Sequence, residues 1–303
     1  MKRRHGFTLI ETIAVLVLLM LVAGTVGVTL VRQQQFYRGA GELIQARQGV
    51  RDASELMSAD LRAISLEDTV RVMADSAVEF YSTIATSVLC AALGDFEIGL
   101  PATGGPRGNT ITSFATEPDT GDLALVFRDT ADSLTGSRWD RYRIASFSIR
   151  ADGAACPATS PFAVPVPGAF SLALRTPLRA EPRAGTPIRF LRRSRYSLYR
   201  SSDGLWYLGY RRCGAVAGAA CGAIQPLSGP YRPYSSDPAA TGILFQYFNS
   251  SGSPLSLGNS SASLARVSVT ARALSAQRLR SGNAVQTFGD SSFVTVSIRN
   301  RTR

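Results

Sequence analysis

Histidine and lysine are nearly absent from this chain of 303 residues, in which His5 is the only histidine and Lys2 the only lysine. Metal sites with imidazole ligands, and catalytic pairs of a nucleophile with histidine, therefore have no candidate beyond the first six residues. The four cysteines show no C-x-x-C spacing, which disfavours a metal site. Paired carboxylates occur, but in no pattern that separates an acid from a base. We therefore expect neither enzyme activity nor a cofactor.

Long apolar runs are also scarce, because only one stretch has the length to cross a membrane. Residues Thr12–Val31 carry no charge, and a helix of that length covers roughly 30 Å, the thickness of one bilayer core. Lys2, Arg3 and Arg4 precede it, and the positive-inside rule keeps such residues in the cytoplasm. We expect a single-span protein whose chain after Arg32 lies outside the inner membrane.

The cysteines all follow this span, in the part of the chain that we expect to meet an oxidising compartment. They are Cys90, Cys156, Cys213 and Cys221, an even number that allows three disulfide pairings. We favour Cys213–Cys221, because the small residues of "CGAVAGAAC" can turn tightly, and Cys90–Cys156 is then the remaining pair.

Positive charge is in excess and is carried almost entirely by arginine. The net charge is +11, and without the three basic residues before the span the chain keeps 30 basic and 22 acidic side chains, a net charge of +8. We expect most of these arginines to be solvated. Arg192, Arg193 and Arg195, with tyrosines interleaved, form a candidate strip for DNA, and Arg211 and Arg212 would lie beside it in a hairpin.

Two other groups of side chains are weaker candidates for binding. Asp119 and Asp122, in "EPDTGD" with Glu117, offer oxygen ligands to calcium, but the spacing differs from an EF-hand loop and favours a solvated turn. The aromatic residues of segment 206–210 could form a binding face, although packing within a sheet is the default for such residues.

The residues after the span predict a long helix. Apolar side chains recur at helical spacing at Leu43, Ala46, Val50, Ala53, Met57, Leu61 and Ile64. An unbroken helix from Phe7 to Ile64 would be roughly 87 Å long. Five glycines along it weaken that expectation, since each costs up to about 1 kcal/mol relative to alanine.

Beyond Ser65 the apolar pattern changes to period two, which predicts strands. A hairpin is expected around Ser202-Asp203-Gly204, and a second with a longer turn in "FQYFNSSGSPL". Gly/Pro/Ser-rich segments 100–110 and 154–168 are expected loops. The predicted fold class is α+β, with the helix packed on a mainly antiparallel sheet and room for an extra β-subdomain. The predicted strands are "VEFYSTI", "LALVFRD", "YRIASFSI", "FSLALRT", "GILFQYF", "ARVSVTARA" and "FVTVSIRN".

The start of the chain resembles the class III signal of type IV prepilins and pseudopilins. Gly6 ends a short basic leader, Phe7 follows it, and Glu11 lies four residues further on in "FTLIE", with the apolar run behind. The resemblance implies that a prepilin peptidase cuts between Gly6 and Phe7 and methylates the new N-terminus. It also implies that the apolar helix stays on the mature chain. Glu11 would then pair with the terminal ammonium of a neighbouring subunit, since a paired charge is tolerated in a helix bundle and a lone one is not.

This resemblance divides the chain into a leader (1–6), a membrane and filament-core helix (7–31), an amphipathic continuation (32–65) and a periplasmic head (66–303). The last strands of the head look like those of large minor pilins and of the J-type minor pseudopilin of type II secretion. The expected role is a minor pilin or pseudopilin that joins or initiates a filament. Its implied partners are the peptidase, other subunits and an inner-membrane assembly platform. Pilus and secretion pseudopilus both remain open, as does a head that acts as a receptor for DNA or a surface.

Overall fold

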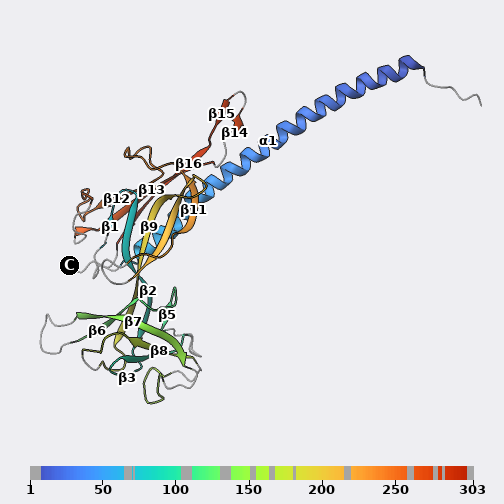
Figure 1. Ribbon diagram of the computed structural model, residues 1–303. Helices are drawn as coiled ribbons and strands as arrows, with labels where there is room; N and C mark the ends of the chain where they lie inside the picture. Colours follow the sequence, from blue (N-terminus) through green and yellow to red (C-terminus); the bar gives the residue numbers. More distant parts are fainter. Residues whose placement is uncertain are drawn as a thin grey trace, which may run out of the picture.

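The computed structural model shows one long helix that carries a β-rich head in two tiers (Figure 1). It describes residues 8–64, 70, 72–103, 111–129, 138–150, 155–163, 168–179, 182–214, 220–257, 263–275, 279–281 and 284–298. The helix is α1 (Leu9–Arg62). The strands are β1 (Val72–Met73), β2 (Ala77–Val88), β3 (Ala91–Gly94), β4 (Glu97–Leu100), β5 (Ser113–Phe114), β6 (Leu123–Arg128), β7 (Arg138–Arg150), β8 (Ala169–Leu174), β9 (Pro187–Arg200), β10 (Trp206–Cys213), β11 (Gln225–Tyr231), β12 (Ile243–Phe248), β13 (Arg266–Leu274), β14 (Leu279–Ser281), β15 (Ala284–Gln286) and β16 (Gly289–Ser297).

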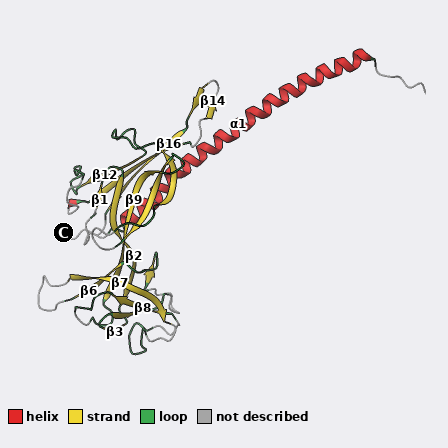
Figure 2. Cartoon of the chain, viewed as in Figure 1, coloured by secondary structure: helices red, strands yellow, loops and turns green. Residues whose placement is uncertain are grey.

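Helix α1 is continuous over 54 residues, about 81 Å at the usual rise per residue. Its first half projects away from the head, and its second half lies against the sheet (Figure 2). The predicted apolar stripe is confirmed on this second half, where Ala53, Met57 and Leu61 are fully buried. Burial of this stripe stabilises the helix more than its intrinsic propensity does.

A glycine allows the helix to approach the sheet closely. A Cβ at Gly49 would lie 3.6 Å from the carbonyl oxygen of Gly229 in β11, so the two backbones nearly touch. The Tyr231 hydroxyl donates to the carbonyl of Gly49 at 2.7 Å in the same contact. Gly49 therefore does not interrupt the helix but contributes to its packing.

The proximal tier consists of the second half of α1, strands β1, β10–β13 and β16, and the adjoining halves of β2 and β9. Its core joins the helical stripe to sheet residues such as Phe80, Leu208, Phe245 and Val269. Strand β13 pairs with β12 on one side and β16 on the other, and β9 lies between β2 and β10. All the described pairings are antiparallel, as predicted.

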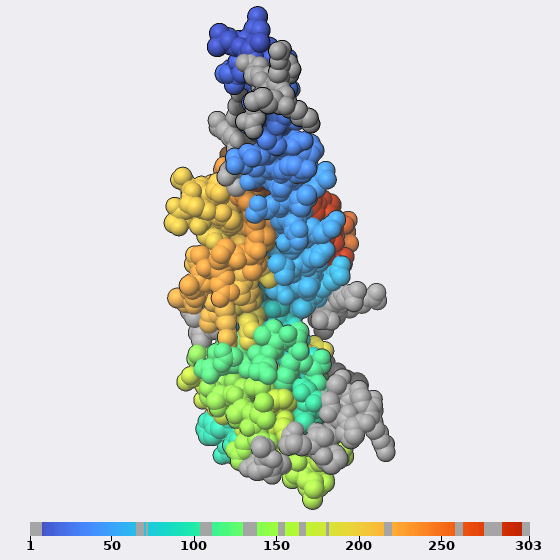
Figure 3. All heavy atoms as spheres, turned by 90° about the vertical axis from the view of Figure 1, so that its right-hand side faces the viewer, coloured from blue at the N-terminus to red at the C-terminus, as the bar shows by residue number. Residues whose placement is uncertain are grey.

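The distal tier is the expected extra β-subdomain and contains β3–β8 with the other halves of β2 and β9. In the distal tier β9 pairs with β6, whereas in the proximal tier it pairs with β10 along the same edge. A separate core forms around Phe170 and Phe190, with Phe114 and Phe147 packed on it. Figure 3 places this tier, in green, at the end of the molecule opposite the start of the helix.

The seven predicted strands correspond to β2, β6, β7, β8, β12, β13 and β16, and the hairpin of β9 with β10 is confirmed. In "FQYFNSSGSPL" a short hairpin is present: Phe248 and Pro254 form an antiparallel bridge, and the Leu255 amide donates to the Tyr247 carbonyl at 2.8 Å. Strand β11 was not predicted, since Pro226 and Pro230 interrupt its pattern. The expected loops at 100–110 and 154–168 lie partly outside the described residues.

Candidate assembly site and neighbouring polar clusters

The N-terminus of α1 is closed by a capping box that uses Glu11. The Glu11 carboxylate accepts hydrogen bonds from the Thr8 amide and the Thr8 hydroxyl, both at 3.0 Å, and the Glu11 amide donates to the Thr8 hydroxyl at 3.4 Å. Such a box satisfies orphan amide groups at a helix start, where a negative charge also complements the helix dipole. Gly6 and Phe7 lie outside the described residues. Glu11 thus has a partner within its own chain.

The helix behind Glu11 is apolar and uncovered. Its most apolar window of 18 residues has a mean hydropathy of 2.7, and none of that window is buried. Leu9, Ile10 and Met20 are each at least 70% exposed. A soluble monomer rarely leaves so large an apolar surface in water, so a membrane or other apolar helices must cover it. The part next to the head continues this surface with Phe36 and Tyr37, both 72% exposed.

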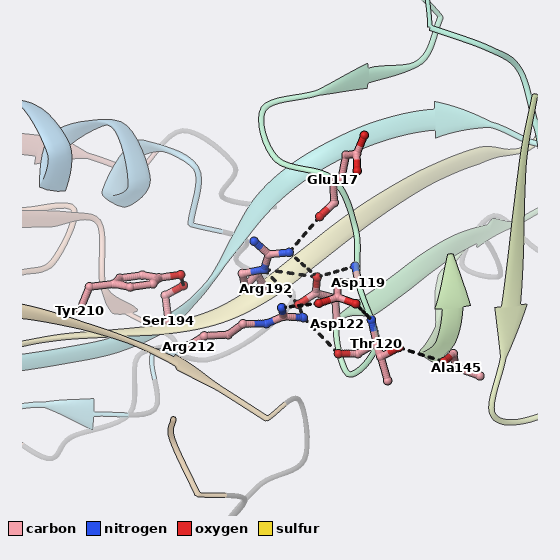
Figure 4. Close-up of polar contacts among 9 residues, drawn as sticks. All are labelled: Glu117, Asp119, Thr120, Asp122, Ala145, Arg192, Ser194, Tyr210 and Arg212. Carbon is pink, nitrogen blue, oxygen red and sulfur yellow. Dashed lines mark hydrogen bonds and ion pairs between the residues drawn. The ribbon is translucent and has the colours of Figure 1, made fainter. Parts of the chain in front are cut away.

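Asp119, Asp122, Arg192 and Arg212 form an ion-pair cluster where the two tiers meet, which we call the waist network (Figure 4). Asp122 accepts from Arg192 at 2.7 Å and from Arg212 at 3.1 Å, and Asp119 accepts from Arg212 at 2.8 Å. Arg192 and Arg212 also donate to the backbone carbonyls of Glu117 and Thr120. Arg212 belongs to the proximal tier and the two aspartates to the distal tier, so the network ties one tier to the other.

The electrostatics of the waist network follow from these contacts. Burial disfavours the charged form of Arg192, but the hydrogen bonds and charge of Asp122 outweigh it and raise the pKa of Arg192. The hydrogen bond from Arg212 lowers the pKa of Asp119, with help from the Thr120 amide. Two guanidinium groups therefore stand where a cation would have to bind, and the structure does not support the calcium interpretation of Asp119 and Asp122. The turn is also not solvated throughout, since Asp122 is 2% exposed.

The predicted DNA strip of Arg192, Arg193 and Arg195 does not exist as one exposed surface. Arg192 belongs to the waist network, on the side of the sheet that faces α1. Arg193 points to the other side, is 7% exposed, and donates through Nε to Glu79 at 2.7 Å. Arg195 shares that side and remains 39% exposed. Alternation along the strand separates Arg192 from Arg193 and Arg195, and of the latter two only Arg195 is exposed.

The two disulfides have the pairing favoured above and lie in different tiers. Cys213–Cys221 closes the loop after β10, and Cys90–Cys156 crosses the distal tier. Glu79 lies near the first disulfide, but bonded sulfurs are not thiolate ligands and Glu79 is occupied by Arg193. This cluster is therefore not a metal centre.

The aromatic residues of β10 divide between the two faces of the sheet. Trp206 and Tyr210 pack against the proximal core, as the default interpretation predicted. Tyr207 points to the opposite face, where its hydroxyl donates to Asp203 at 2.7 Å. This hydrogen bond, with some desolvation, raises the pKa of Tyr207 to about 12. The ion-pair partners of Arg192, Arg212 and Arg193 could not be predicted from the sequence, because each pair joins residues 70 to 114 positions apart.

Comparison with protein families identifies one match: residues 1–27 fit the prokaryotic N-terminal methylation motif. No curated protein and no solved structure matches the chain. The chain therefore carries the class III signal of type IV pilins and pseudopilins, which supports a subunit of that general class. This signal implies processing by a prepilin peptidase and assembly with other such subunits, and the uncovered apolar helix fits membrane anchoring.

Proposed function

We propose that this chain is a minor subunit of a type IV pilus-like filament, cut between Gly6 and Phe7 and N-methylated on Phe7. The observation that carries the proposal is the methylation motif at the head of an apolar helix with nothing to cover it. Before assembly the helix would span the inner membrane, with the leader in the cytoplasm and the head in the periplasm. Within the filament it would lie among the helices of neighbouring subunits.

The two-tier head supports a minor rather than a major role. The start of α1 and the distal tier lie at opposite ends of the molecule (Figure 3), so a chain anchored by α1 with its start in the cytoplasm would point its distal tier away from the cell. A parallel subunit stacked further from the cell would need space beyond the end of α1, which the distal tier occupies. Such a head is hard to repeat along a filament but fits at its outer end. We therefore place the chain among the subunits that initiate assembly.

Glu11 would connect processing to assembly. Its carboxylate bonds to Thr8 within the chain, and cleavage would create an ammonium on Phe7, the residue before Thr8 in the sequence. In a bundle of apolar helices, an ammonium of one subunit can be neutralised by the carboxylate of another. The local hydrogen bonds to Thr8 would hold Glu11 until that partner arrives.

The test is mass spectrometry of the N-terminal peptide from sheared surface filaments and from the cell envelope. A methylated Phe7 peptide in the sheared material is expected for a pilus subunit. The same peptide confined to the envelope would indicate a type II secretion pseudopilus or a role limited to priming. An intact Met1 start in cells that assemble filaments would refute the proposal. Replacing Glu11→Gln should leave cleavage intact and reduce incorporation, whereas Glu55→Gln, on the exposed part of the helix, should change neither.

A further inference from the structure

Strand β16 forms an open edge of the proximal tier. It pairs with β13 along its whole length, and among the described strands none pairs with its other side. It lies beside the second half of α1 (Figure 1), where the Ser54 and Ser292 hydroxyls are 2.8 Å apart and Arg47 pairs with Asp290 at 3.4 Å. The even-numbered side chains of β16 therefore face the helix, and the odd-numbered ones face away from it.

The backbone groups of the odd-numbered residues point out of the sheet. The Ser275 amide donates to the Phe288 carbonyl at 2.7 Å, so alternation directs the even-numbered residues of β16 toward β13. The amides and carbonyls of Phe293, Thr295 and Ser297 are then directed outward. Within the described part of the chain, no backbone hydrogen bond reaches them from outside β16.

The opposite edge of the same three strands is closed. On β12 the Phe245 amide donates to the Asp75 carbonyl at 2.7 Å, and the Tyr247 carbonyl accepts from the Leu255 amide at 2.8 Å. Proteins usually protect an exposed edge with proline, outward charges or a bulge. Strand β16 has a regular register with β13 and one charged residue, Asp290, which faces the helix. Such an edge is a template for a further strand.

The surfaces beside this edge indicate what that further strand would carry. At roughly 100° per residue, Arg51 and Arg62 lie about 60° and 80° beyond Ser54, on the side away from the buried Met57. They therefore project over the position of an added strand. Both are exposed, and no described carboxylate forms an ion pair with either of them. On the other face of the sheet, Phe293 is 64% exposed and offers an apolar cross-strand contact.

We propose that the outer edge of β16 pairs with an extended segment of a partner protein, in which acidic side chains alternate with apolar or β-branched ones. Main-chain hydrogen bonds to Phe293, Thr295 and Ser297 would hold the segment. Arg51 and Arg62 would select acidic side chains on the side of the helix. The proposal goes beyond the assembly role, because it rests on contacts within the head.

The experiment measures binding of a fluorescent synthetic peptide, in which glutamate alternates with threonine and valine, to the full chain in detergent micelles by anisotropy. Hydrogen exchange should slow at the amides of Phe293 and Thr295 when the peptide binds, and change little at Ser292 and Val294, which already bond to β13. The same peptide with its backbone amides N-methylated should bind at least about tenfold more weakly, because it cannot complete the ladder.

Thr295→Pro removes one outward amide and should weaken binding about fivefold or more. Thr295→Val is its matched control: it loses the same hydroxyl contact with Ser268 but keeps the amide, so it should bind as the wild type does.

Arg51→Gln with Arg62→Gln should weaken binding about fivefold, since two exposed ion pairs are lost. Arg143→Gln with Arg175→Gln is the control for net charge, because both residues are exposed and belong to the distal tier. The proposal is overturned if the peptide does not bind the wild-type chain at millimolar concentrations, or if the N-methylated peptide binds equally well. It is also overturned if Thr295→Pro binds as well as Thr295→Val, or if the two arginine pairs have equal effects.

Discussion

Removing the charge of Asp122 should destabilise the junction between the two tiers. Asp122 is 2% exposed and accepts from the Asp119 amide at 3.0 Å as well as from Arg192 and Arg212. In Asp122→Asn the shape is kept, but Arg192, whose side chain is 12% exposed, loses its carboxylate. Breaking a buried ion pair from one side costs about 3–5 kcal/mol. The lower end applies here, because Arg192 keeps its bond to the Glu117 carbonyl.

The free energy of unfolding of the full chain in micelles should therefore fall by about 3 kcal/mol, measured by denaturant titration. Amide hydrogen exchange should rise first in β6 and in the turn before it, since these segments depend on the network. Asp119→Asn is the control: its side chain is 62% exposed, and an exposed pair contributes about 0–1 kcal/mol. Equal effects of the two variants, or a loss below about 1 kcal/mol for Asp122→Asn, would show that the network does not hold the tiers together.

Three further predictions concern stability. Met57→Ala, at a fully buried position between helix and sheet, should lower the free energy of unfolding by about 2–5 kcal/mol; a loss below about 1 kcal/mol would mean that the helix is not anchored there. Replacing Cys90 and Cys156 by alanine opens a loop of 66 residues and should cost about 4 kcal/mol by the chain-entropy model, with the loss confined to the distal tier in hydrogen exchange. Because the pKa of Asp119 is lowered by Arg212, its contribution is present above the ordinary value of 3.8 and is lost as the pH falls through the lower folded value. The difference in stability between wild type and Asp119→Asn should therefore vanish at acidic pH, and a difference that grows there would contradict this assignment.

Features encoded by neighbouring residues could be predicted from the sequence. The processing signal is a run of adjacent residues, and the amphipathic stripe around Met57 repeats at the period of a helix. The β9–β10 hairpin follows from two alternating runs around Asp203-Gly204, where Gly204 takes the positive φ of 83° that the turn requires. Each of these depends on contacts over a few positions, so the local pattern is sufficient. For the same reason β11 was missed: its prolines break the local pattern, and pairing with β10 supports the strand.

Only the tertiary structure decided which face each arginine occupies. The sequence placed Arg192, Arg193 and Arg195 together, and alternation alone separates the first and second of them. Which side meets the helix depends on sheet register, since a shift by one residue exchanges the two faces. Register in turn placed Asp122 beside Arg192, left Arg195 opposite Arg211, and divided the head into two tiers that share β2 and β9. The sequence by itself determined the processing signal and the apolar helix behind it; the long-range pairing of strands determined which arginines lie beside which carboxylates.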